Sequence, residues 1–263
     1  MTFNEMFPLE KEVGSYILVG QLGSKVYGTD TPESDDDFVG IVVPPLSYYF
    51  GLKQWPDTDT FKVNKKKEYN AELQGFEIKK FLRLCLNFNP NAIPFLYLDD
   101  SDYIFQNSCG RLLIKNRHAF TSKRAYTTMI GYAKSQLKSV VNGDTGKLGA
   151  KRKELVTKYG YDVKYAAHTI RILHMALEFF KDGKLNVKRT WDLDQLMSIR
   201  TGSWHLGEWL AEVKFLISLA EIEEKKNNLL EKPDFELVDE LCIQIIDWMT
   251  NHTLQVRTGD ILL

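Results

Sequence analysis

The stretch "VGQLGSKVYGTDTPESDDDFVGIVV", residues 19–43, places three consecutive aspartates between two apolar runs. Adjacent carboxylates repel one another and gain nothing from apolar surroundings. They form either a solvated turn, in which aspartates cap backbone amides, or a site that receives a cation. The neighbouring sequence is needed to choose between these two interpretations.

Both apolar runs have the length and the boundaries of buried strands. Residues 15–20 end at turn residues, and residues 37–43 end at two prolines that cannot continue a β-ladder. Side chains alternate along a strand, so Asp35 and Asp37 are expected on one face and Asp36 on the other. Two converging carboxylates favour a hard divalent cation, Mg²⁺ or Mn²⁺.

Gly23 and Ser24 follow the first predicted strand directly and open a short segment that ends near Gly28. Backbone amides at such a turn, with a small hydroxyl, form a cradle for phosphate oxygens. The spacing matches neither the dinucleotide-binding glycine pattern nor the P-loop. A phosphate cradle beside metal-binding carboxylates is typical of phosphoryl chemistry on a nucleoside triphosphate.

These residues closely resemble the Gly-Ser…Asp-x-Asp signature of the DNA polymerase beta-like nucleotidyltransferase superfamily. More narrowly, they resemble its predicted nucleotidyltransferases that include RNA-ligase-associated RNA-repair polymerases. Later segments are similar to this narrower family in the same order: "SYYFGL" (47–52), "EIKKFLRLCLNFNPNAIPFLY" (77–97), "YGYDVKYAAHTIRILHMALEFFKDGKL" (159–185) and "LMSIRTG" (196–202). The resemblance therefore spans most of residues 15–205.

The chain changes character near residue 115. Before that point we expect a third strand over 67–76 and an amphipathic helix over 77–88. After it, long helical patterns cover 123–141, 161–183, 203–230 and 233–252, with Gly183 as a helix stop. The predicted fold class is α+β: a small polymerase-beta-like nucleotidyltransferase α/β domain over 1–115, followed by an all-helical substrate-binding domain over 116–263.

The resemblance implies a third acidic residue on a neighbouring strand, completing a site for two metal ions. Counting back from Lys80 and Phe81 in the matching segment, this position is Glu72, where the family usually has aspartate. Asp35, Asp37 and Glu72 are thus the implied catalytic residues and ligands of Mg²⁺ or Mn²⁺. Glu77 is the alternative third ligand, although an acidic residue in the first turn of a helix commonly has a structural role.

Lys164, His168 and Arg171 lie at i, i+4 and i+7 of an otherwise apolar helix and form a polar stripe. Such a stripe is either a solvated face or part of a site. The resemblance implies that it faces the cleft, where its cations would hold triphosphate or nucleic-acid phosphates. It likewise implies that Gly23 and Ser24 bind the terminal phosphates. The basic stretch 141–153 is expected to be an exposed loop.

The implied activity is transfer of NMP from an NTP to an acceptor hydroxyl, with an RNA (or DNA) 3′ end in repair as the acceptor. Two alternatives remain open: antitoxin-like transfer of NMP to a protein, and a catalytically weak nucleotide- or nucleic-acid-binding module. The net charge of -1 indicates local rather than global polyanion binding. Three scattered cysteines, no signal-like start and no long apolar run predict a cytoplasmic protein without a membrane partner.

Overall fold

A computed structural model describes residues 14–32, 34–52, 60–66, 71–142 and 149–258. Its first half contains a five-stranded mixed sheet with the strand order β3-β4-β2-β1-β5. The strands are β1 (Ser15–Leu22), β2 (Asp36–Val43), β3 (Thr60–Lys66), β4 (Ala71–Glu77) and β5 (Tyr103–Gln106). Strands β2 and β4 pair in parallel, whereas the other neighbours pair antiparallel.

Short helices connect and cover the sheet. They are α2 (Ser24–Tyr27), α3 (Leu46–Phe50), α4 (Ile78–Leu86) and α5 (Ser108–Lys115), with 3₁₀ turns η1 (Ile93–Tyr97), η2 (Asp100–Asp102) and η3 (Arg117–Phe120). The apolar spacing of residues 77–88 correctly predicts the amphipathic helix α4. Its buried face includes Phe81, Leu82 and Cys85.

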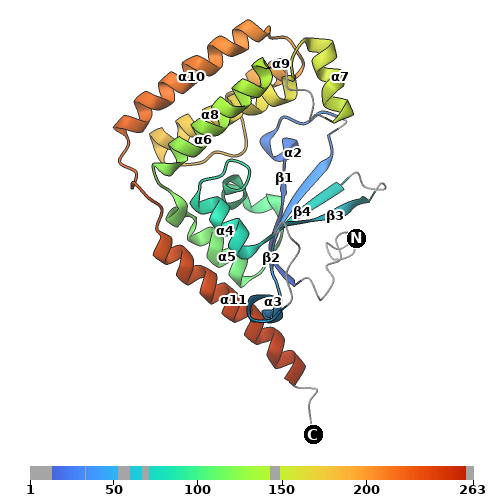
Figure 1. Cartoon of the computed structure of the whole chain (residues 1–263), viewed down its shortest axis with the longest axis vertical. Coiled ribbons are helices and arrows are strands. Elements are labelled where there is room, and N and C mark those ends of the chain that lie inside the picture. Colours follow the sequence, from blue (N-terminus) through green and yellow to red (C-terminus); the bar gives the residue numbers. More distant parts are fainter. Residues whose placement is uncertain (1–13, 33, 53–59, 67–70, 143–148, 259–263) are drawn as a thin grey trace.

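The second half is helical: α6 (Arg124–Val141), α7 (Ala150–Tyr159), α8 (Val163–Asp182), α9 (Leu193–Arg200), α10 (Leu206–Lys226) and α11 (Phe235–Thr258). Helix α8 packs against α6, α9 and α10, and most of its side chains are buried. In Figure 1 these helices form a layer beside the sheet. Gly183 adopts a left-handed conformation at the end of α8, which confirms the predicted stop.

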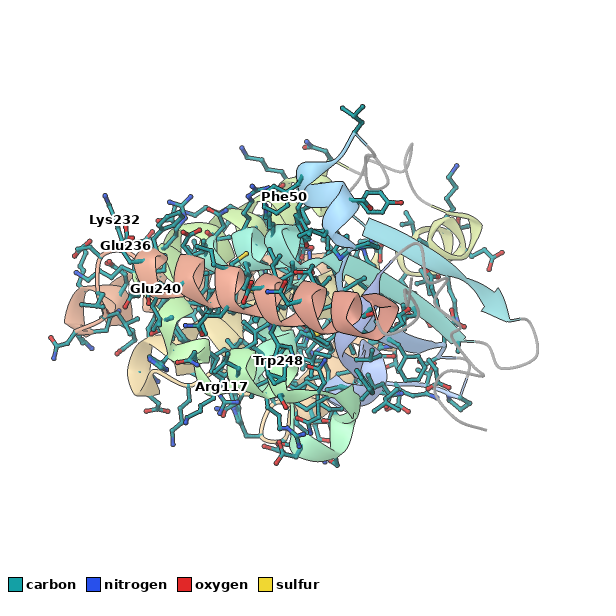
Figure 2. The ribbon with its side chains drawn as sticks, turned by 90° about the horizontal axis from the view of Figure 1, so that it is seen from below. Phe50, Arg117, Lys232, Glu236, Glu240 and Trp248 are labelled. Carbon is teal, nitrogen blue, oxygen red and sulfur yellow. The ribbon has the colours of Figure 1, made fainter. Side chains whose placement is uncertain are left out.

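Helix α11 returns to the first half of the chain. It packs against α4, α5 and η3, and Figure 2 shows it crossing the molecule beneath them. One buried apolar cluster accordingly contains residues from both halves, from Ile17 to Ile245. The mixed α/β region and the helical region confirm the predicted fold class. The boundary after residue 115 coincides with the end of α5 and stays a prediction.

Two local predictions differ from the structure. The sequence does not predict strands β3 and β5, and residues 67–70 of the expected third strand lie outside the described residues. The expected loop over 141–153 is wrong from Ala150 onward, where α7 begins. Arg152 there binds Asp162 at 2.6 Å and lies over the Tyr165 ring, so tertiary contacts stabilise a helix that the charged sequence did not reveal. None of the described helices has the length and apolar character needed to cross a bilayer.

Candidate active site

The sheet places two acidic residues side by side. Asp37 on β2 is the register partner of Glu72 on the parallel strand β4, and of Leu22 on the antiparallel strand β1. Because Gly23 follows Leu22 directly, the glycine-serine turn begins in the same row of the sheet. The structure therefore brings together the predicted phosphate turn and two of the three predicted carboxylates.

Gly23 and Asp37 lie in close contact. Gly23 has φ of 92°, a conformation that L-residues rarely adopt, and a Cβ built on it would lie 2.5 Å from Oδ2 of Asp37. Two independent reasons therefore require glycine at position 23: the backbone conformation, and the space that the carboxylate of Asp37 occupies. Ser24 then starts the short helix α2.

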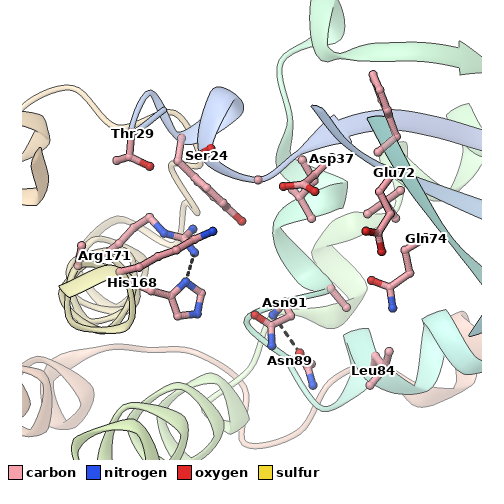
Figure 3. A pocket seen from close by; sticks show the side chains of 18 of the residues that line it. Ser24, Thr29, Asp37, Glu72, Gln74, Leu84, Asn89, Asn91, His168 and Arg171 are labelled. Carbon is pink, nitrogen blue, oxygen red and sulfur yellow. Dashed lines mark hydrogen bonds between the residues drawn. The ribbon is translucent and has the colours of Figure 1, made fainter. Parts of the chain in front are cut away.

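A cavity of about 690 Å³ opens beside this row. Its walls include Gly23, Ser24, Asp37 and Glu72 from the sheet side, Asn89 and Asn91 after α4, Lys164, His168 and Arg171 from α8, and Arg200 from α9. Figure 3 shows Asp37 and Glu72 on one side of the cavity and His168 and Arg171 on the other. The volume is within the range of small-molecule sites, which is large enough for a nucleotide.

Asp35 and Asp36 are placed differently from Asp37. Asp36 accepts hydrogen bonds from Lys25 at 2.6 Å and from Gln21 at 2.9 Å, which tie α2 and β1 to the start of β2. Asp35 precedes the strand and is absent from the described cavity wall. No group of three His, Cys, Asp or Glu side chains arranged to hold a metal ion occurs among the described residues.

The donor set at Asp37 and Glu72 nevertheless fits a hard divalent cation. Both are carboxylates, both line the cavity, and they occupy paired positions on adjacent strands. Oxygen ligands of this kind suit Mg²⁺ and Mn²⁺. Asp35 as a further ligand stays a prediction.

Arg171 is a buried cation on the opposite wall, with only 5% of its surface exposed. Its guanidinium lies 3.3 Å from the centre of the Tyr27 ring and donates a hydrogen bond of 2.7 Å to Nδ1 of His168. Within the described parts of the chain no carboxylate forms an ion pair with it. A buried charge without a counterion is costly, so this position favours an anionic ligand.

His168 acts as a neutral partner of Arg171. Burial, followed by the nearby cations Arg171, Arg152 and Lys164, holds the pKa of His168 well below its usual value. A guanidinium has no acceptor, so Nδ1 of the imidazole must accept and Nε2 carries the proton. Nε2 lies 3.4 Å from the hydroxyl of Tyr132. The predicted polar stripe thus consists of an exposed cation (Lys164), a neutral imidazole (His168) and a buried cation (Arg171).

A buried polar network holds the end of α2, where Tyr27 contacts Arg171. His174 donates to Asp192 at 2.7 Å, and Arg189 binds both Asp192 and Glu178. Burial alone would raise the pKa of Asp192, but hydrogen bonds from His174 and Arg189 outweigh it and hold that pKa low. The amide of Arg189 donates to the carbonyl of Tyr27, so the network fixes the ring on which Arg171 stacks.

Arg200, Asn89 and Asn91 are among the cavity residues to which the sequence assigns no role. Arg200 lies inside the family-like segment 196–202, and desolvation lowers the pKa of its guanidinium despite the nearby carboxylate of Asp30. Asn89 and Asn91 enter the cavity through a sharp turn, in which Asn89 N donates to the carbonyl of Leu84. Phe88 takes the left-handed position of this turn (φ 50°), and its fully buried ring packs on Phe179.

Glu77 has the structural role expected of it. It caps α4 by accepting a hydrogen bond from the amide of Lys80 at 2.9 Å, and it accepts another from the hydroxyl of Tyr49 at 2.9 Å. Both interactions satisfy the buried carboxylate away from the described cavity wall. This arrangement leaves Glu72 as the acidic residue of β4 that faces the cavity.

Residues 4–243 match the RNA repair pathway DNA polymerase beta family (RlaP). The uncharacterized protein YcgL of Bacillus subtilis (strain 168) is 25% identical over 146 residues, 55% of this chain and 55% of that protein. An uncharacterized 38.9 kDa protein from the nrdC-mobD intergenic region of Enterobacteria phage T4 is 27% identical over 127 residues, 46% of this chain and 37% of that protein. The chain spans about half or less of the length of these relatives.

Among solved structures, a nucleotidyltransferase-like protein from Exiguobacterium sibiricum 255-15 aligns with a TM-score of 0.30 and 12% identity, covering 80% of this chain and 69% of that chain. The family match covers most of the sequence and includes the glycine-serine turn, the aspartate triplet and the cavity-lining part of α8. The chain therefore belongs to the RNA repair pathway DNA polymerase beta family.

Proposed function

We propose that this chain transfers NMP from an NTP to an acceptor hydroxyl, and that the acceptor is the 3′ end of an RNA under repair. One observation carries the proposal: a cavity in which the paired carboxylates Asp37 and Glu72 face the buried guanidinium of Arg171. Such opposed charges suit a metal-bound triphosphate. Membership of the family supports the class of reaction and the RNA acceptor.

The phosphate-binding side combines residues from both halves of the chain. Arg171, fixed by Tyr27 and His168, would donate charge-assisted hydrogen bonds to the oxygens of the triphosphate. The hydroxyl of Ser24 and the backbone at Gly23, which line the same cavity, would also bind the terminal phosphates. Lys164 and Arg200 line the same cavity and add positive charge.

Asp37 and Glu72 would hold Mg²⁺ or Mn²⁺, with Asp35 as the predicted third ligand. When bound, such ions neutralise phosphate charge and lower the pKa of an acceptor hydroxyl. Glu72 stands where the resemblance implies aspartate, and its extra methylene adds a rotatable bond to the carboxylate. Gly23 keeps space for the carboxylate of Asp37, which stays directed at the cavity.

The proposed chemical step needs no covalent bond between the substrate and the protein. The acceptor hydroxyl would release its proton to water, its oxygen would bond to the α-phosphorus, and the bond from that phosphorus to the bridging oxygen would break so that pyrophosphate leaves. Arg171 and Ser24 would stabilise the charge that develops on the departing pyrophosphate. Positioning and electrostatic stabilisation then provide most of the rate, as in phosphoryl transfer generally.

The test is incubation of the protein with Mg²⁺ and α-labelled NTP, with either a 3′-hydroxyl RNA or the same RNA blocked at its 3′ end. We expect label on the open RNA and none on the blocked RNA. Label on a polypeptide instead would establish protein nucleotidylation. NTP binding without any transfer in Mg²⁺ or Mn²⁺ would establish a binding module and overturn the proposal.

A further inference from the structure

A second groove, with a volume of about 700 Å³, lies on another side of α4. It is bounded by the end of α4, the start of α6 and the link between α10 and α11. Its charged lining residues are the cations Arg83, Lys123, Arg124 and Lys232 and the acids Glu224 and Glu231. Figure 2 shows Lys232 at the end of the molecule where α11 begins.

The groove carries cations that the protein does not neutralise. Lys123 pairs with Glu231 at 2.6 Å, which removes one charge of each sign. Arg124 donates two hydrogen bonds, of 2.6 and 2.9 Å, to the neutral Oδ1 of Asn87. Among the residues with described side chains, no carboxylate forms an ion pair with Arg83, Arg124 or Lys232. Three cations therefore remain against Glu224, and the groove favours an anionic ligand.

Aromatic and apolar groups accompany this charge. Phe235 lines the groove with 58% of its surface exposed, and Tyr126 on α6 lines it as well. An exposed aromatic ring beside unpaired cations is the combination used by proteins that bind single-stranded nucleic acid, where bases stack and phosphates meet Lys or Arg.

One face of α6 leads from the groove to the cavity. Arg124 and Thr128 line the groove, whereas the hydroxyl of Tyr132 contacts Asn91 and His168, both of which line the cavity. At about 1.5 Å per residue, Arg124 and Tyr132 are separated by about 12 Å along the helix. Gly131 on this face is exposed, with nothing within 4 Å of a built Cβ, and the segment between Arg124 and Tyr132 has no charged residue.

We propose that this groove binds the single strand that precedes the acceptor end, and that the strand reaches the cavity along this face of α6. The identity of the strand as acceptor rests on the proposed function, whereas the binding itself does not. An acidic protein segment would also satisfy the charge. It would explain neither the exposed Phe235 nor the uncharged path that ends at Asn91, so a nucleic acid is favoured.

The experiment measures binding of fluorescently labelled single-stranded RNA of 4 and 12 nucleotides by anisotropy at several salt concentrations. The test variant combines Arg83→Gln, Arg124→Gln and Lys232→Gln. Its matched control combines three exposed cations outside the groove, Arg111→Gln, Lys115→Gln and Lys214→Gln. Equal thermal unfolding midpoints of the two variants establish that neither change disrupts folding.

We expect the test variant to bind the 12-nucleotide RNA about tenfold more weakly than the control. Its slope of log K against log salt should be smaller by about 2, because three phosphate contacts contribute roughly 0.7 each in a single strand. Binding of the 4-nucleotide RNA should change far less, since a short strand held at the cavity does not reach all three cations. The Phe235→Ala variant should also bind the 12-nucleotide RNA more weakly than the wild type, with no change for the 4-nucleotide RNA.

Equal affinities and slopes for the test and control variants would overturn the inference, as would the absence of RNA binding at low salt. An acidic peptide that binds the wild type more tightly than RNA, and loses affinity in the test variant, would replace the nucleic acid by a protein. If RNA binding depends on the groove but no NMP is transferred, the proposed function fails and this inference stands. If NMP is transferred to RNA but neither binding nor transfer depends on the groove residues, the proposed function stands and this inference fails.

Discussion

The guanidinium of Arg171 lies 3.3 Å from the centre of the Tyr27 ring. This contact joins the central helix of the second half to the turn that follows Gly23 in the first half. The proposed triphosphate site is consequently built from both halves of the chain, and its shape depends on their packing. Arg189 adds a second link, because its amide binds the carbonyl of Tyr27.

Substitution of Arg171 by methionine should weaken nucleotide binding and leave the folded state intact. A charged hydrogen bond is worth about 1.5–3 kcal/mol, so we expect NTP affinity by calorimetry to fall roughly 10- to 100-fold. The free energy of unfolding without nucleotide should change by less than about 1 kcal/mol, because removal of a buried charge offsets the loss of the hydrogen bond to His168 and of the contact with Tyr27. Arg111→Met, on the exposed face of α5, is the control. An unchanged NTP affinity in Arg171→Met would contradict the assignment.

The low pKa of His168 makes stability depend on pH in a defined direction. Below about pH 6.5 the imidazole of His168 binds a proton in the unfolded chain but stays neutral in the folded chain. As the pH is lowered from there, the free energy of unfolding should decrease by up to about 1.4 kcal/mol per pH unit. Above about pH 6.5 this contribution is constant. Urea unfolding at pH 7.5 and 5.5 should show a smaller difference for His168→Gln than for the wild type.

His118 provides the comparison for that measurement, because it is exposed on η3. His118→Gln should retain the pH dependence of the wild type. Equal pH dependence in His168→Gln and the wild type would show that the imidazole of His168 is not held neutral by its surroundings.

Glu72 and Glu77 should separate catalysis from stability. Glu72→Gln should slow NMP transfer by about 100-fold or more while the free energy of unfolding changes by less than about 0.5 kcal/mol. Glu77→Gln should lower that free energy by about 1–2 kcal/mol, because it weakens the cap of α4 and the bond from Tyr49, without a comparable loss of rate. The reverse pattern would make Glu77 the metal ligand.

The long elements could be predicted from the sequence because their patterns are strong. The two apolar runs, the helix over 77–88 and the four long helices all appear near their expected bounds. Strand β5 has only four residues, and β3 is an edge strand with three lysines among its seven residues, so neither gives a long apolar run in the sequence.

The site was predictable only where the chain is locally continuous or resembles its family. Gly23, Ser24 and Asp37 lie within one short stretch, and the resemblance supplied Glu72. Arg200 and Asn91 reach the cavity through packing of distant elements, which no local pattern reveals. The β-ladder begins at Asp36, one residue after Asp35, and Asp35 as a metal ligand stays a prediction.

The most direct test is the rate of NMP transfer for single substitutions across the aspartate triplet. Asp37→Asn should lose about 100-fold or more of the rate, because its carboxylate lies beside Glu72 and against Gly23 in the cavity. Asp36→Asn should keep most of the rate, since that side chain is bound to Lys25 and Gln21. If Asp35 is the further metal ligand, the Asp35→Asn variant should lose about as much of the transfer rate as the Asp37→Asn variant. Full activity in Asp37→Asn, or equal losses in Asp36→Asn and Asp37→Asn, would contradict the account.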